Sequence, residues 1–155
     1  MHRERTGSTD GGSPVATGGL GLQDSGGPRV RPLWRELEDE LRRLQGEHGH
    51  GHPAALDVEE RLAAALSEVG RLDQARQAYE EVLTYRAVLD GDHAEHTAAV
   101  ARDLFALVCR MDDRPAMAEV YYRFLSWIPM RDPASLTPAL REVLGDVERL
   151  LSRST

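Results

Sequence analysis

The stretch EHGHGHP, residues 47–53, carries three of the chain's six histidines at alternate positions, with a glycine between each pair. Imidazole nitrogen is a good ligand for Zn²⁺, Ni²⁺ and Cu²⁺, so His48, His50 and His52 are the first candidates for a metal site. The glycines leave this loop flexible, and no cysteine lies nearby in the sequence to complete a ligand set. We therefore expect no metal site here, and keep a metal- or ligand-responsive regulator that uses the histidine loop as an alternative hypothesis.

The other residues with ligating or nucleophilic side chains are isolated. His93 and His96 supply only two ligands, and we interpret them as loop and early-helix residues next to a helix-capping Asp92 or Thr97. Cys109 is the single cysteine, so it forms no internal disulfide, which fits a reducing cytoplasm. The chain has no glycine-rich phosphate loop and no G-x-S-x-G or H-E-x-x-H motif. We expect no enzyme activity and no cofactor.

The charge balance excludes two classes of partner. The chain has 26 acidic residues and 19 basic ones, all arginine, for a formal net charge of -7. An acidic protein gains nothing from counterion release, so we expect no binding to nucleic acid or to an anionic membrane surface. No apolar run reaches the roughly 20 residues that span a bilayer. We expect a cytoplasmic protein, and we interpret the carboxylates of LWRELEDEL and DVEER as solvated helix faces.

The elements that position these residues are helices. Residues 1–31 include eight glycines and few bulky apolar residues, which predicts a disordered tail. Residues 32–152 carry apolar residues at helical spacing and show no period-two alternation, which predicts an all-α domain. Gly46 and Gly70 are expected to end the first two helices, and Pro129 to end the fifth. The predicted helices cover residues 32–46, 53–69, 72–89, 95–111, 114–128 and 134–151.

The apolar pattern repeats. The buried stripe predicted for the second helix reappears in the fourth, and that of the third in the fifth, both shifted by 42 residues. The matched positions are Val58, Leu62, Ala65, Leu66 and Val69 with Val100, Leu104, Leu107, Val108 and Met111, then Ala75, Tyr79, Val82 and Leu83 with Met117, Tyr121, Phe124 and Leu125. One shift that serves two consecutive helices predicts stacked helical hairpins, a short α-solenoid of about six helices.

The stretch LAAALSEVGRLDQARQAYEEVL, residues 62–83, resembles the tetratricopeptide repeat. Gly70 ends a first helix, the turn GRLD follows, and Ala75 and Tyr79 stand where that repeat places a small residue and an aromatic. The 42-residue period is similar to the variant found in kinesin light chains, and the loops GHGHPAAL (49–56) and GDHAEHT (91–97) resemble its inter-repeat loop. The second repeat departs from the pattern, with Phe105 and Met117 at positions of small residues.

The resemblance implies a function. In that family the first helices of successive pairs line a groove that binds a peptide or helix of another protein. Carried over, the groove residues are Asp57, Glu60, Ser67 and Glu68 from the first pair and Arg102 and Arg110 from the second. Their mixed charge predicts a partner oriented by electrostatics. The expected function is therefore a non-enzymatic protein–protein adaptor.

Two aromatic residues fall off the predicted stripe. Tyr121 and Phe124 are expected in the core, whereas Tyr122 and Trp127 are candidate interface anchors. An alternative places Trp127 under the C-terminal helix. Contact with a second copy, in a homodimer, is the alternative to binding a different protein.

Overall fold

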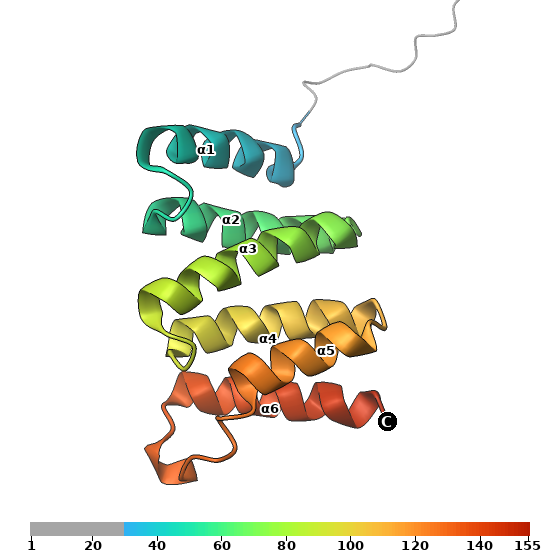
Figure 1. The fold of residues 1–155 in the computed structure, drawn as a ribbon. Coiled ribbons are helices and arrows are strands. Elements are labelled where there is room, and N and C mark those ends of the chain that lie inside the picture. Colours follow the sequence, from blue (N-terminus) through green and yellow to red (C-terminus); the bar gives the residue numbers. More distant parts are fainter. Residues whose placement is uncertain (1–29) are drawn as a thin grey trace, which may run out of the picture. The chain divides into compact units, whose positions relative to one another are not determined.

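The computed structural model describes residues 30–155, so most of the predicted tail, 1–31, lies outside the described residues. The domain is all-α, as predicted, and no strand occurs within the described range. Six helices pack sequentially in antiparallel pairs (Figure 1). They are α1 (Leu33–His48), α2 (Pro53–Glu68), α3 (Leu72–Asp90), α4 (Glu95–Arg110), α5 (Arg114–Val120) and α6 (Pro138–Arg153), with a π-helical turn, η2 (Tyr121–Leu125), and a 3₁₀ turn, η3 (Pro133–Ser135).

The apolar stripes predicted at 42-residue spacing form the core. Each helix from α1 to α4 packs on the next one in the chain, and α4 also contacts α5, η2 and α6. Because α4 has neighbours on several sides, Val100, Phe105 and Val108 are fully buried. Val69 is an exception: it is 55 % exposed, since it lies at the end of α2, where fewer neighbours cover it. Met111, Met117 and Tyr121 of the second pair are half-buried.

The end of α1 differs from the prediction. Gly46 lies inside the helix, which continues to His48, and the cap is Gly49 at φ 94°. A positive φ at this position strains any residue with a Cβ, so the chain turns at the glycine that can adopt it. The prediction for Gly70 is correct, because α2 ends just before it and its φ is 81°.

The starts of α4 and α6 also differ. Neither Asp92 nor Thr97 caps α4; the N-cap is Ala94, and the buried Thr97 hydroxyl donates to the Arg86 carbonyl at 3.5 Å. The sixth helix begins at Pro138 rather than at 134. Pro138 disfavours a helical conformation at Thr137, whose Oγ1 instead accepts a hydrogen bond from the Leu140 amide at 3.2 Å.

The fifth predicted helix, 114–128, is split. Regular α-helix ends at Val120 and continues as the π-helical turn η2 to Leu125. Phe124, Leu125 and Ile128 are still buried, as the apolar pattern predicts.

Candidate binding groove

The first helices of the pairs, α2 and α4, form a groove together with α6. One hollow of about 320 Å³ lies between α2 and α4, and a second of about 400 Å³ lies between α4 and α6. Asp103 and Ala106 of α4 line both hollows, so the two are adjacent along that helix. Small side chains, Ala64 of α2 and Ala106 of α4, leave the space between the flanking polar residues.

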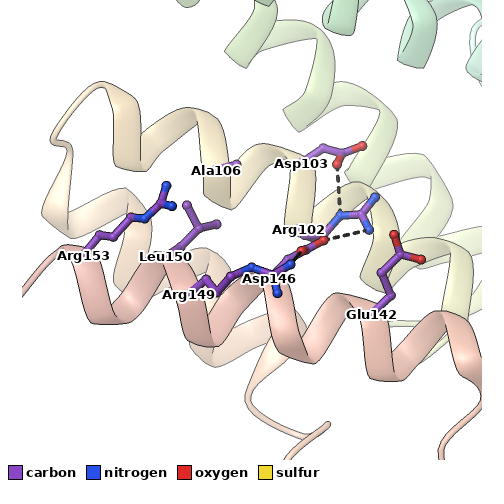
Figure 2. Close-up of a pocket in the computed structure, with 8 residues that line it drawn as sticks. All are labelled: Arg102, Asp103, Ala106, Glu142, Asp146, Arg149, Leu150 and Arg153. Atoms are coloured by element: carbon purple, nitrogen blue, oxygen red, sulfur yellow. Dashed lines mark hydrogen bonds and ion pairs between the residues drawn. The ribbon is translucent and has the colours of Figure 1, made fainter.

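The α4–α6 hollow contains a network of ion pairs (Figure 2). Arg102 donates to Asp103 at 3.2 Å and to Asp146 of α6 at 3.4 Å. Arg149, one turn further along α6, also donates to Asp146. Arg102 therefore bridges two helices and is only 24 % exposed, so its charge is largely used within the domain.

The α2–α4 hollow holds another pair of predicted groove residues. Arg110 of α4 donates to the Ser67 hydroxyl at 2.9 Å, although the two residues lie 43 positions apart in the sequence. Tyr79 of α3 also lines this hollow. Burial, with the nearby charges of Asp103 and Glu60, raises the pKa of the Tyr79 phenol, and burial likewise raises the pKa of Asp103 despite the neighbouring Arg102. Both groups are therefore held toward their neutral forms.

The other end of the groove holds Asp57 and Glu60, one turn apart at the start of α2. Asp57 accepts a hydrogen bond at 2.5 Å from Arg86, a buried residue of α3. Glu60 Oε2 lies 3.0 Å from His96 Nε2 on α4. The remaining predicted groove residue, Glu68, is exposed and forms no ion pair with any residue in the described range.

The charged side chains of α2, α4 and α6 differ between the starts and the ends of these helices. The starts of α2, α4 and α6 carry Asp57, Glu60, Glu95 and Glu142. The ends of α4 and α6 carry Arg110, Arg149 and Arg153, whereas α2 ends on the exposed Glu68. These three helices run in the same direction (Figure 1), so the groove has an acidic end and a basic end. Among these three helices, α4 alone has both an acidic residue in its first turn, Glu95, and a basic residue in its last turn, Arg110, which complement the helix dipole.

Sequence reasoning missed Arg86, His96 and Asp146 as groove residues. A signal for Asp146 was present, because partners across neighbouring first helices lie close to one repeat period apart. Arg102 and Asp146 are 44 residues apart, and Thr137 donates to Glu95 at a separation of 42. No such signal exists for Arg86, which reaches Asp57 from the second helix of the pair.

The histidine loop packs against the domain. His52 Nδ1 accepts a hydrogen bond from the Ala54 amide at 3.2 Å and so caps α2, with Pro53 as its first residue. The rings of His48 and His52 stack with centroids 4.5 Å apart, and His50 Nδ1 lies 3.7 Å from Glu81 of α3. The end of this loop therefore begins α2 at Pro53, the helix start predicted from the sequence.

A different set of side chains brings metal-binding atoms together. Asp57, Glu60 and His96 offer ligand atoms that all lie within 4.8 Å of one another. Among residues 30–155, no other group of three or more His, Cys, Asp or Glu side chains brings its ligand atoms this close together.

The remaining candidate residues have separate surroundings. Tyr122 is 73 % exposed. Trp127 is half-buried, donates through its Nε1 to the Phe124 carbonyl at 2.8 Å, and stacks on His93 rather than standing free. Burial raises the pKa of the Cys109 thiol, which disfavours the thiolate that a nucleophilic cysteine needs.

A scan against models of known protein families finds no match for this chain, and a search of curated proteins finds no relative. None of the helices described in residues 30–155 has the length and apolar character needed to cross a membrane.

Proposed function

We propose that this chain is a small interaction module of the tetratricopeptide-repeat type, which binds a peptide or helix of another protein and performs no chemistry itself. The observation that carries the proposal is the pair of adjacent hollows along α2, α4 and α6, with alanines between polar residues. The 42-residue shift, which places equivalent apolar residues in two successive helical pairs, supports the repeat assignment.

The charges of the groove indicate the charge pattern that a partner segment would need. Arg110 contacts only the neutral Ser67 across the groove, and Arg153 forms no ion pair within residues 30–155. These two guanidinium groups are therefore available at the basic end, whereas Asp57 and Glu60 lie at the acidic end. A partner segment with acidic residues at one end and basic residues at the other would match this field, and complementary charge favours one binding direction.

Site-specific photo-crosslinking in the native cell tests this proposal. A photoreactive amino acid replaces Ala64 or Ala106, which line the groove, or Gln77, an exposed residue of α3 that lines neither groove hollow, as the matched control. We expect one discrete crosslinked partner from the two groove positions and none from Gln77. Equal crosslinking from all three positions, or none from Ala64 and Ala106, would overturn the proposal.

Once crosslinking has identified the partner, its affinity for charge-reversed variants provides a second test. Arg110→Glu together with Arg153→Glu is expected to weaken binding at least tenfold and to reduce its dependence on salt. Arg102 is unsuitable for this test because it holds Asp103 and Asp146 in place. The matched control is Arg123→Glu, an exposed arginine on η2.

Self-association is the second candidate, and one observation favours it. A hollow of about 640 Å³ lies between α4, α5 and the end of α6, with Phe105, Met117, Tyr121 and Leu151 among its lining residues. The exposed Tyr122 lines the same hollow. Light scattering at tens of micromolar protein decides between the two candidates, because a monomer mass excludes an obligate dimer.

A further inference from the structure

We propose that Asp57, Glu60 and His96 form a binding site for Zn²⁺ at the junction of α2 and α4. This inference is independent of the proposed function, because the site needs no partner protein to form. It also differs from the histidine-loop hypothesis, since none of its ligands comes from residues 47–53.

The geometry brings three ligands from two helices to one point. Asp57 and Glu60 are three residues apart on α2, so both project from the same face of that helix. His96 lies in the first turn of α4, and its Nε2 is 3.0 Å from Glu60 Oε2. One ligand atom from each residue lies within 4.8 Å of the other two, a separation that a single ion with bonds of about 2.0–2.2 Å can bridge after small side-chain rotations.

The ligand types favour zinc. One imidazole nitrogen and two carboxylates form a mixed nitrogen and oxygen set, which Zn²⁺ accepts, whereas Mg²⁺ and Ca²⁺ prefer oxygen alone. Three protein ligands leave a fourth position of the tetrahedron open. The side chains of Asp57 and His96 are 63 % and 42 % exposed, so an ion can reach the site from solvent.

A buried arginine, Arg86, holds one of the three proposed ligands, Asp57, in place. Arg86 is 6 % exposed and donates from its Nη2 to Asp57 Oδ1 at 2.5 Å, which fixes that carboxylate and leaves Oδ2 for a metal. Its Nε is buried and has no hydrogen-bond partner among the described atoms. Its Nη1 lies 3.8 Å from Asp90, a third carboxylate near the site.

The local charge balance also fits a dication. Asp57 and Asp90 lie beside the guanidinium of Arg86, and Glu60 lies beside His96. With His96 counted as uncharged, the three carboxylates and the one guanidinium carry two net negative charges. A divalent cation neutralises this excess.

Titration of the full chain, freed of metal with a chelator, tests the site. Isothermal titration calorimetry with ZnCl₂ at pH 7.5 is expected to show binding that weakens at least tenfold in His96→Gln and in Glu60→Gln. Co²⁺ in place of Zn²⁺ gives a visible d–d absorption band that reports coordination directly, and Asp57→Asn should change this band. Far-ultraviolet circular dichroism confirms that each variant keeps its helices.

Two matched controls separate this site from other histidines. His93→Gln removes an imidazole three residues from His96, stacked on Trp127 and outside the cluster, and should leave affinity unchanged. A variant with His48, His50 and His52 all changed to Gln should also bind zinc normally. The proposal is overturned if the wild-type chain binds no Zn²⁺, if only the triple loop variant loses binding, or if folded His96→Gln and Glu60→Gln bind as tightly as wild type.

Discussion

Glu59 of α2 lies beside Glu81 of α3, inside the first helical pair, where the side chain of Glu59 is only 4 % exposed. Burial, followed by the charge of Glu81 and a hydrogen bond with it, raises the pKa of Glu59 to about 8. One oxygen of Glu59 is buried without a hydrogen-bond partner among the described atoms. The expectation that the carboxylates of DVEER are all solvated is therefore wrong for Glu59, which is a buried, protonated acid at neutral pH.

Glu59→Gln should alter the pH dependence of stability. In the unfolded chain this carboxyl loses its proton near its ordinary pKa of 4.5, whereas the folded chain keeps it up to about pH 8. Between these values the folded state binds more protons, so the wild type loses stability as pH rises. Glu59→Gln removes this slope and raises the free energy of unfolding at pH 8 by up to about 4 kcal/mol.

Urea denaturation at pH 5, 6.5 and 8 measures this change. Glu81→Gln is the partner variant: it removes the neighbouring negative charge, lowers the pKa of Glu59 and flattens the slope in part. An unchanged slope in Glu59→Gln would show that Glu59 does not carry the pH dependence.

Phe105→Ala should strongly destabilise the domain. Phe105 is fully buried on α4, and its ring centroid lies 6.3 Å from that of Tyr121. Truncation leaves a cavity in the part of the core shared by several helices, at a cost of about 3–5 kcal/mol in unfolding free energy, measured by urea denaturation. Tyr122→Ala, at the adjacent 73 % exposed position, should change stability by less than about 0.5 kcal/mol. Comparable losses in the two variants would contradict this assignment of the core.

Two glycines near the end of α1 should respond oppositely to alanine. Gly46 lies inside the helix with open space where a Cβ would be added, so Gly46→Ala should stabilise the chain by roughly 0.5–1 kcal/mol. Gly49 has φ 94°, so Gly49→Ala should destabilise it by about 1 kcal/mol or more. Thermal unfolding of both variants measures the difference, and the reverse order would restore Gly46 as the cap.

Thr137→Ala should weaken the start of α6. The Thr137 hydroxyl accepts from the Leu140 amide at 3.2 Å and donates to Glu95 of α4 at 2.5 Å. Losing an N-cap costs about 1 kcal/mol of stability. Thr137→Ser keeps the hydroxyl and should retain most of that stability in the same denaturation assay. Asp92→Ala serves as the control, since Asp92 does not cap α4, and a loss equal to that of Thr137→Ala would contradict the structural assignment.

The sequence by itself determined which segments are helical and which faces are buried. Helical periodicity and the spacing of apolar residues are local properties, so Leu62 and Leu104 could be assigned to the core directly, and Pro53 to a helix start. The 42-residue shift extended this local pattern to successive pairs. The resemblance to the tetratricopeptide repeat placed Ser67 and Arg110 on the groove face, and these two residues meet between α2 and α4.

Only the tertiary structure decided which polar groups meet and which lose contact with water. His96 reaches Glu60 across 36 residues, Arg86 reaches Asp57 across 29, and Glu59 is buried beside Glu81. Each of these outcomes depends on the rotation and crossing of two packed helices. A polar residue shows no periodic preference that reports such a contact, because its burial becomes favourable only when the partner is already in place.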